Sequence, residues 1–358
     1  MSIPDTPKHY AIIGGGLAGS LLAARLCMAG QAVSLFDDAA PAAASRVAAG
    51  MFNIVTGRFG ALTWQAATLL GDLRQWLAQE ALAPLRQYVH DGPIFRPFHD
   101  AEDYNKWSAR AAAPEFAPWI DFSERPLYPD FIHNPLGGIR ILACGWMDTG
   151  GLITALQDLL VRDWGLKRYT GNLLPAQVDL PGRRIESPGG ETIAFDDLVC
   201  AQGYRVGEWP WWRDLPLIPN KGELLLVEPA GWTLPLALSK KVYVVPLPDG
   251  RLVVGSTYEK VFAHTGPTGQ ARSEIGRHLD GLLRQPYSIV GQWAGVRPTT
   301  PNRRPIVGTH PHHPHLHLLT GFGTKGVLLA PYCSRLLAAR LLGQPVILPA
   351  EIDLARFG

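Results

Sequence analysis

The sequence predicts an α/β protein in which a part with a parallel β-sheet, built from separated segments, is interleaved with a second part dominated by an antiparallel β-sheet. Three observations lead to this fold class. The chain opens on a strand, a glycine turn and a helix, it closes on the same order of elements, and residues 220–257 between them have the pattern of antiparallel strands. A length of 358 residues suits two domains.

The opening element is the stretch YAIIGGGLAGSLLAARLCMAGQAVSLFDD, residues 10–38. Gly14, Gly16 and Gly19 have the spacing G-x-G-x-x-G between an apolar strand and a helical run. The first glycine permits a tight turn, the second lets the backbone approach a pyrophosphate, and the third lets helix and strand pack closely. A second apolar run ends on Asp37, whose carboxylate can accept hydrogen bonds from a ribose. The alternative is an ordinary turn without a ligand, but these features together favour a bound dinucleotide.

The elements that follow are predicted from periodicity and turn residues. Small residues over 39–60 indicate a loop that can approach a planar ligand, and residues 62–80 have a helical period. Another helix is expected after Asp148, a candidate N-cap. A short hairpin then leads into a buried strand over 198–201, and a turn at Asp249-Gly250 joins two antiparallel strands.

Composition limits the possible partners. Lys and Arg number 33 against 31 Asp and Glu, which gives no electrostatic reason to expect nucleic acid or an anionic membrane, so a small-molecule partner is expected. The four cysteines stand far apart, without a C-x-x-C pair, and suggest neither a disulfide framework nor a zinc site. The N-terminus lacks a signal-peptide pattern and no long apolar window occurs, which predicts a cytoplasmic protein without an integral membrane segment.

Six stretches resemble, in order, those of the D-amino-acid oxidase and glycine oxidase family of flavoproteins. In that family a Rossmann-type FAD-binding domain is interleaved with an antiparallel substrate domain. The stretches are the opening glycine motif with Asp37, SRVAAGM (45–51), DDLVCAQG (196–203), YVVPLPDGRLVVGST (243–257), GVRPTTPNRRPIVG (295–308) and TGFGTKGVLLAP (320–331).

The resemblance also implies a division of the chain into two domains. Residues 82–134 carry none of the six signals, so their role stays open. The expected FAD-binding domain comprises residues 1–78, 141–209 and 290–358, and the substrate domain comprises residues 79–140 and 210–289.

The resemblance implies non-covalent FAD, since no cysteine stands just before the last glycine turn. It places the adenosine ribose at Asp37, the isoalloxazine near residues 48–50, and the pyrimidine end of the flavin at residues 323–327. The N-terminus of a helix that begins near Gly326 would stabilise the negative charge that reduced flavin gathers near N1 and O2. The residues implied for the cofactor are Gly14, Gly16, Leu17, Ala18, Gly19, Asp37, Asp38, Ser45, Arg46, Ala48, Ala49, Gly50, Ala201, Gly203, Gly323, Thr324, Lys325, Gly326 and Val327.

The family oxidises a C–N bond by passing hydride from the substrate α-carbon to flavin N5, without an obligatory side-chain base. Such a site needs mainly a carboxylate clamp and a dry pocket. Arg297 matches the family arginine that pairs with the substrate carboxylate, and Tyr243 matches the tyrosine that hydrogen-bonds it. The residues alone leave a structural ion pair for Arg297 and a core aromatic for Tyr243 as alternatives.

Three residues depart from the family pattern. Thr324 stands where glycine oxidases carry an arginine, Lys325 follows it, and Tyr258 replaces a smaller apolar residue. The pocket is therefore expected to differ from one for glycine or a free D-amino acid. The side chain of Lys325 is expected to serve the flavin or an acidic group of the substrate, with a solvated lysine as the alternative. The candidate catalytic residues are Arg297, Tyr243, Lys325 and Tyr258.

Two further features are given structural interpretations. The run HPHHPHLH, residues 310–317, offers metal-ligand side chains, but its prolines and the lack of a neighbouring acid or cysteine favour a solvated loop that enters a strand, and no metal is expected. Trp209, Trp211 and Trp212 are expected in a core or a domain hinge, with a pocket cap as the alternative.

These observations favour an FAD-dependent oxidoreductase that acts on an amine or amino-acid-like compound, with dioxygen or an electron carrier as the final acceptor. One alternative is a subunit or binding protein that holds FAD without turning over alone. The other is an RNA-modifying flavoenzyme, which the absence of excess basic residues disfavours.

Overall fold

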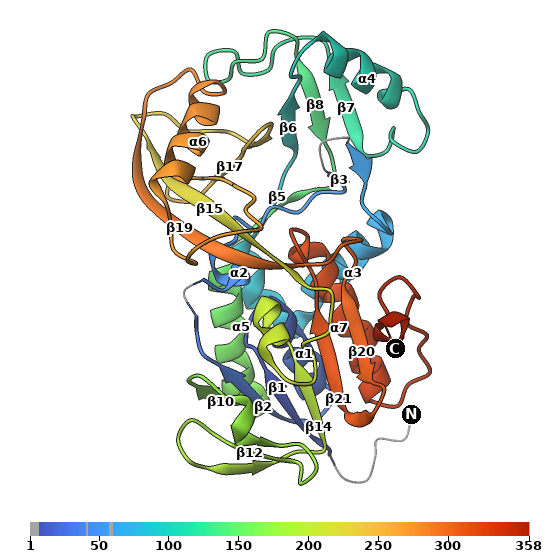
Figure 1. Cartoon of the computed structure of the whole chain (residues 1–358). Coiled ribbons are helices and arrows are strands. Elements are labelled where there is room, and N and C mark those ends of the chain that lie inside the picture. The colour runs from blue at the N-terminus through green and yellow to red at the C-terminus, as the bar shows by residue number, and fades with distance from the viewer. Residues whose placement is uncertain (1–6, 41, 57–59, 358) are drawn as a thin grey trace.

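The structure, a computed structural model, describes residues 7–40, 42–56 and 60–357 (Figure 1). The chain forms two parts, one above the other in Figure 1, each built around its own large β-sheet. The strands of both sheets come from separated stretches of sequence, so the chain passes repeatedly between the two parts.

The lower part contains a six-stranded sheet of order β10-β2-β1-β14-β21-β20, which is parallel except at the edge strand β20. Alternate residues of β1 face opposite layers: Tyr10 and Ile12 pack with the helices, and Ala11 and Ile13 pack on the other side. Burial on both faces explains why these strands are continuous apolar runs in the sequence. The strands are β1 (His9–Ile13), β2 (Ala32–Asp37), β10 (Lys167–Thr170), β14 (Asp197–Cys200), β20 (Ile306–His310) and β21 (His313–Thr320).

Four helices share the core on one face of this sheet, and a three-stranded antiparallel sheet covers part of the other. The Asp148 carboxylate accepts a hydrogen bond of 2.9 Å from the Gly151 N–H, so the predicted N-cap is confirmed. The helices are α1 (Leu17–Met28), α3 (Ala66–Ala78), α5 (Thr149–Trp164) and α7 (Gly326–Leu341), and the small sheet consists of β11 (Val178–Asp179), β12 (Arg184–Glu186) and β13 (Thr192–Ala194).

The upper part contains an eight-stranded sheet of order β19-β15-β18-β17-β16-β6-β8-β7. All its neighbouring strands are antiparallel except β16 and β6, which pair in parallel. Helix α6 (Gly269–Asp280) packs against β15, and α4 (Ala101–Ala111) packs near β7 (Figure 1). The strands are β6 (Ile94–Pro97), β7 (Ile120–Ser123), β8 (Gly138–Ile141), β15 (Ile218–Pro229), β16 (Ala237–Ser239), β17 (Tyr243–Pro246), β18 (Leu252–Gly255) and β19 (Tyr287–Thr299).

Short elements complete the described chain. Two small antiparallel pairs, β3 with β4 and β5 with β9, lie between the large elements. The short elements are α2 (Ala44–Val47), β3 (Val55–Thr56), β4 (Ala61–Leu62), η1 (Glu80–Tyr88), β5 (Val89–Asp91), β9 (Gly145–Met147), η2 (Pro175–Gln177), η3 (Gly203–Glu208) and η4 (Leu354–Phe357).

The predicted fold class is confirmed, but two local predictions are wrong. The helix expected over 62–80 begins at Ala66, because Leu62 belongs to β4 and pairs with Val55. The loop expected over 39–60 contains the single helical turn α2 and strand β3, while residues 41 and 57–59 of it lie outside the described residues. Both errors arise because a two-residue strand pair has no periodicity that a sequence window can detect.

The structure also shows where the predicted domain segments pack. Residues 291–299 of β19 pair with β15 in the eight-stranded sheet, although the prediction assigned them to the FAD-binding domain. Leu82 and Leu85 of η1 share the core of the lower part, although the prediction placed them in the substrate domain. Residues 82–134, which the sequence left open, supply β6, β7 and α4.

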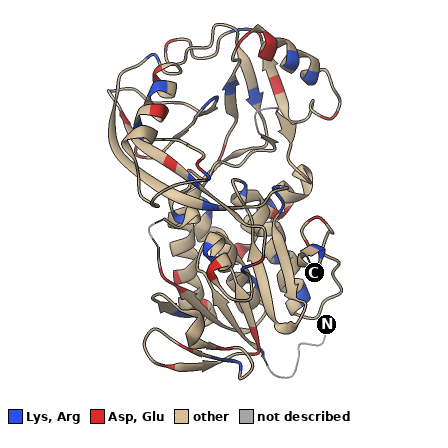
Figure 2. Ribbon diagram, viewed as in Figure 1, with Lys and Arg blue, Asp and Glu red and all other residues tan. Residues whose placement is uncertain are grey.

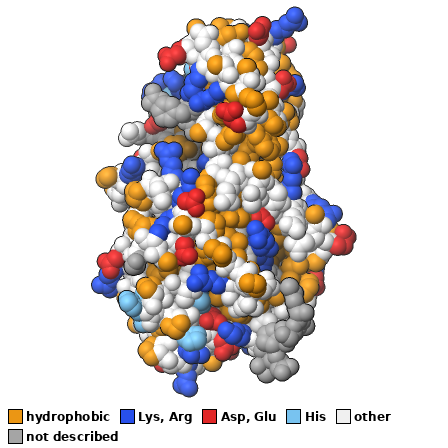
Figure 3. All heavy atoms as spheres, turned by 90° about the vertical axis from the view of Figure 1, so that its right-hand side faces the viewer, with side chains coloured by type: hydrophobic (Ala, Val, Ile, Leu, Met, Phe, Trp, Pro, Cys, Tyr) orange, Lys and Arg blue, Asp and Glu red, His pale blue; other side chains and the backbone are white. Residues whose placement is uncertain are grey.

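Charge is distributed over both parts of the molecule. Figure 2 shows Lys and Arg as well as Asp and Glu on the upper and the lower part. On the face shown in Figure 3, apolar and charged side chains are interspersed. None of the helices in the described ranges has the length and apolarity needed to cross a membrane.

Candidate functional site

A cavity of about 2630 Å³ runs from the glycine turn of the lower sheet to the eight-stranded sheet of the upper part. Ligand pockets for small molecules are usually about 300–1,000 Å³, so this cavity has room for more than one small ligand. All four candidate catalytic residues line it, and so do most candidate cofactor residues. Gly19 and Arg46 are the candidates outside the lining.

The glycine turn brings three backbone segments into close contact. Gly14 has φ +109°, and a Cβ there would lie 2.4 Å from the carbonyl oxygen of Ala201. A Cβ on Gly19 would lie 1.9 Å from the carbonyl oxygen of Gly14. Both positions therefore require glycine, and Gly19 acts in the packing of α1 while Gly14 lines the cavity.

The N-terminus of α1 is suited to an anion. Its N-cap is Gly16, which offers no side-chain cap, and the first turn holds no acidic residue. The Ser45 hydroxyl accepts a hydrogen bond of 3.2 Å from the Leu17 N–H. The helix dipole favours negative charge at this end, as a diphosphate would supply.

Two arginine–aspartate pairs lie where β2 ends, and both aspartates line the cavity. Asp37 accepts a hydrogen bond from Arg46, and Asp38 accepts one from Arg205. Arg205 also donates to Asn172 Oδ1 over 3.1 Å. An ionised carboxylate has about four acceptor sites, so Asp37 can bind a ribose while it keeps Arg46. Arg205 and Asn172 were not predicted, because their approach to Asp38 depends on the tertiary fold.

The cavity also contains acceptors without partners. Asn53 Oδ1 and Gln202 Oε1 are buried, have no hydrogen-bond partner, and belong to residues that line the cavity. A buried acceptor without a partner costs about 1–3 kcal/mol. A bound ligand with N–H or O–H donors would satisfy both oxygens, so the residues present fit a polar cofactor.

Arg297 is the candidate clamp. It lies on β19 opposite Asn220 of β15, and its Nη1 donates to Asn220 Oδ1 over 3.1 Å. Nη1 also donates to the Thr257 carbonyl over 3.3 Å, and Nη2 donates to Ser256 Oγ over 2.6 Å. The centre of the guanidinium lies 4.8 Å from the ring centre of Tyr258. These partners are neutral and no ion pair of Arg297 occurs in the described ranges, so its charge is available for a ligand carboxylate.

Both candidate tyrosines lie close to Arg297. Tyr243 begins β17 and pairs with Gly255 of β18, and burial raises the pKa of its hydroxyl. Tyr243 is therefore neutral at ordinary pH and can donate a hydrogen bond. Tyr258 is 64% exposed and covers the guanidinium from outside. Beside these two tyrosines, the Arg297 guanidinium stays accessible to a ligand in the cavity.

Lys325 is the N-cap of α7 and is half-buried at the cavity. Its Nζ donates to Thr63 Oγ1 over 3.2 Å. Burial, together with the smaller effects of the charges of Arg304 and Arg303, lowers the pKa of Lys325 to about 8. These observations argue against a fully solvated lysine. Thr63 was not predicted as a site residue, because the sequence does not show that the end of β4 meets α7.

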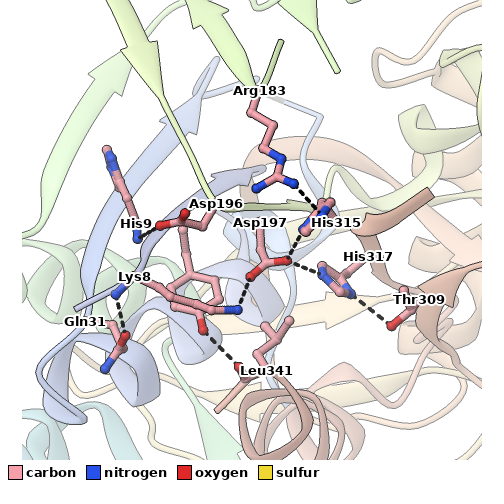
Figure 4. Close-up of polar contacts among 11 residues, drawn as sticks. Lys8, His9, Gln31, Arg183, Asp196, Asp197, Thr309, His315, His317 and Leu341 are labelled. Atoms are coloured by element: carbon pink, nitrogen blue, oxygen red, sulfur yellow. Dashed lines mark hydrogen bonds and ion pairs between the residues drawn. The ribbon is translucent and has the colours of Figure 1, made fainter. Parts of the chain in front are cut away.

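The histidine run lies away from this cavity, in the β20–β21 hairpin. There Asp197 accepts hydrogen bonds from Lys8 and His317, and His315 lies 3.4 Å from the same carboxylate (Figure 4). No acid stands next to these histidines in the sequence, but the pairing of β14 with β21 brings Asp197 to them. The predicted solvated loop is wrong for most of the run, because His310 ends β20 and His313 begins β21. Trp209 and Trp212 are buried in the adjacent core, as predicted. No cluster of three or more metal-ligand side chains occurs in the described part of the chain.

The family model described as DAO, FAD dependent oxidoreductase, matches residues 9–340. The chain belongs to the DAO family of FAD-dependent oxidoreductases. FAD is therefore its cofactor, which the open end of α1 and the unpartnered acceptors of the cavity fit. When bound, FAD would supply the acceptor for a hydride.

The chain is similar to two relatives and to one solved structure. A glycine oxidase of Pseudomonas aeruginosa is 28% identical over 363 residues, which cover 96% of this chain and 97% of the relative. The tRNA 5-methylaminomethyl-2-thiouridine biosynthesis bifunctional protein MnmC of Thiobacillus denitrificans is 30% identical over 374 residues. That match covers 98% of this chain but 59% of the relative. The crystal structure of glycine oxidase from Geobacillus kaustophilus has a TM-score of 0.84 at 20% identity, and the match covers 98% of this chain and 99% of that one.

Proposed function

We propose that this enzyme oxidises the C–N bond of an amine that carries a carboxylate, with hydride transfer to flavin N5. The observation that carries this proposal is Arg297, a guanidinium that faces the cavity and is held by neutral acceptors alone. A planar fork of donors without a protein carboxylate suits bidentate binding of a ligand carboxylate.

The residues around Arg297 have separate roles in this proposal. Asn220, Ser256 and the Thr257 carbonyl orient the guanidinium, and the Tyr243 hydroxyl donates to the second carboxylate oxygen. Tyr258 shields the outer face of Arg297 from water. Because the substrate is held by its carboxylate, its α-carbon can be positioned for hydride transfer without a catalytic base.

The proposal extends to the residues that would hold FAD. The diphosphate would lie at the N-terminus of α1, the ribose at Asp37, and the pyrimidine end of the flavin at the N-terminus of α7. Lys325 adds a cation there. The described residues that line the cavity include no cysteine, and Cys27, Cys144, Cys200 and Cys333 are all buried elsewhere, which supports non-covalent FAD.

Arg297→Lys tests the proposal, because it keeps the charge and removes the fork. We expect kcat/KM to fall at least about tenfold on a carboxylate-bearing amine and to change little on a simple amine of the same length. Lys167→Gln, an exposed position on β10, is the matched control. Equal losses on both substrates would show that Arg297 supports the fold and does not bind a carboxylate.

A second candidate function is oxidation of an amine within an RNA, for which the 30% identity with the MnmC relative speaks. The near-balance of charge over the sequence and the interspersed surface charges of Figure 3 favour a small substrate. A protein that holds FAD without turnover is the remaining alternative. Anaerobic reduction of the flavin by a small amine would exclude it, and the acceptor, dioxygen or an electron carrier, follows from the rate of reoxidation in air.

A further inference from the structure

The charge of the cavity differs from that of the whole chain. Lys and Arg nearly balance Asp and Glu over the sequence, at 33 against 31. Among the described residues that line the cavity, eleven are Lys or Arg and five are Asp or Glu. Excess cations are therefore gathered inside the cavity, where they raise the local concentration of anionic ligands.

Known ligands account for part of this excess. Near the adenosine end, Asp37 and Asp38 are paired with arginines. The diphosphate of FAD brings negative charge, Arg297 has the substrate carboxylate as its proposed partner, and Lys325 lies at the flavin end of α7. A second group of cations in the upper part has no anionic partner among the protein carboxylates, FAD and the substrate carboxylate named above.

This group lies at the tip of the β16–β17 hairpin. Lys240 and Lys241 both line the cavity at the turn, which is closed by a 2.8 Å hydrogen bond from the Lys240 N–H to the Val242 carbonyl. Lys240 is half-buried and no ion pair of either lysine occurs in the described ranges. The parallel pairing of β16 with β6 brings Arg96 to the same end of the sheet.

The groups that face the hairpin tip have both signs. Asp103 is engaged by Arg96 through bonds of 2.8 and 3.1 Å, and Asp100 caps α4. Burial lowers the pKa of Lys240, and the charges of Lys241 and Arg96 lower it further, against the opposite effect of the two aspartates. Cations that repel one another in a half-buried site reduce stability, and such arrangements occur where a ligand supplies the compensating charge.

The hairpin tip is close to the carboxylate clamp. Tyr243 follows Lys240 by three residues, and three residues of extended chain span at most about 10 Å. Tyr243 interacts with Arg297 and Ser256. A molecule bound to Arg297 can therefore reach the lysines with an arm of a few carbon atoms.

We propose that Lys240 and Lys241 bind a second anionic group of the substrate, a distal carboxylate or a phosphate, while Arg297 binds the first. This inference rests on the proposed function, since it takes Arg297 as the clamp for the first carboxylate. The enzyme then acts on an amine with two acidic ends. It excludes glycine-sized substrates by leaving the lysines without a partner.

The test compares alkanedioates of five to seven carbons with alkanoates of the same length, titrated calorimetrically into the FAD-loaded protein at constant ionic strength. We expect at least one alkanedioate to bind about tenfold to a hundredfold more tightly than its alkanoate, the range for charge-assisted hydrogen bonds. Lys240→Gln with Lys241→Gln should abolish this preference and leave alkanoate binding unchanged. Lys240→Arg with Lys241→Arg should keep it, as should the control Lys167→Gln.

The outcomes separate this inference from the proposed function. Equal binding of the two series by the wild-type protein, or equal losses of both in the glutamine variant, would overturn the lysine site. If Arg297→Lys leaves alkanoate binding intact while the glutamine variant loses the alkanedioate preference, the clamp is wrong and the lysine site stands. A short single-stranded RNA is the last ligand tested. If it binds the wild type more tightly than every alkanedioate, and the glutamine variant binds it more weakly, the lysines bind nucleic acid instead.

Discussion

Replacement of Asp197 by Asn should destabilise the fold in a pH-dependent manner. Asp197 begins β14 and is 4% exposed, at the end of the lower sheet shown in Figure 4. Its Oδ2 accepts from Lys8 Nζ over 3.1 Å, and its Oδ1 lies 3.2 Å from His317 Nε2. Asparagine preserves the shape of the side chain but removes the negative charge.

The size of the effect follows from the pKa of the Asp197 carboxyl. Burial raises this pKa, but the hydrogen bonds and charges of His317 and Lys8 outweigh burial and bring it to about 2, from an ordinary 3.8. A shift of nearly two units corresponds to about 2.5 kcal/mol. Because the pKa of the folded state is depressed, this stabilisation is present above about pH 4 and is lost as the pH falls towards 2.

Urea denaturation of the FAD-loaded protein, followed by flavin fluorescence and circular dichroism, measures this effect. At pH 7 we expect Asp197→Asn to lower the free energy of unfolding by about 2–3 kcal/mol, and at pH 3 by less. Asp158→Asn, which removes an exposed pair with Arg168, should change it little at either pH. A variant as stable as the wild type at pH 7, or a loss that does not depend on pH, would refute this account of the network.

Three further predictions concern the cofactor and its surroundings. Acid precipitation should leave FAD in the supernatant, and colour in the pellet would contradict non-covalent binding. Asp37→Ala should weaken FAD by about 1.5–3 kcal/mol, measured by titration of the apoprotein, because a charged acceptor of the ribose is lost; full affinity would remove Asp37 from the site. Lys325→Met should lower the flavin reduction potential and slow all substrates alike if Lys325 serves the flavin, whereas a loss confined to one substrate class would place it in the substrate pocket. Since the pKa of Lys325 is lowered to about 8, the difference in potential between the wild type and Lys325→Met should decline above pH 8, and a difference that stays constant across that range would contradict this.

The sequence predicts those elements whose determinants are local. The turn at Gly14, the cap at Asp148 and the helix that begins at Gly326 were found because glycine spacing, a capping residue and apolar periodicity are each contained in a short window. The role of residues 82–134 could not be predicted in this way, because β6 and β7 join the sheet by pairing with strands from other parts of the sequence.

In the site, too, local motifs can be predicted from the sequence and contacts between distant segments cannot. Arg297 was identified from a motif, but its neutral surroundings depend on the pairing of β15 with β19 and on the position of Ser256. The ion pair of Asp37 with Arg46 and the contact of Lys325 with Thr63 likewise join different segments of the chain. No periodicity in the sequence indicates that these segments meet. Side-chain partners across elements are set by tertiary packing, which local patterns do not specify.

Anaerobic titration of the FAD-loaded wild-type protein with carboxylate-bearing amines tests the central claim most directly. The panel contains D-, L- and N-methyl amino acids, with and without a second acidic group, and the corresponding simple amines. We predict that at least one carboxylate-bearing amine bleaches the absorbance of the oxidised flavin and yields the imine-derived carbonyl product in equal amount, while its decarboxylated counterpart does so far more slowly. Bleaching by simple amines at the same rate, or by none of the carboxylate-bearing amines, would contradict the claim.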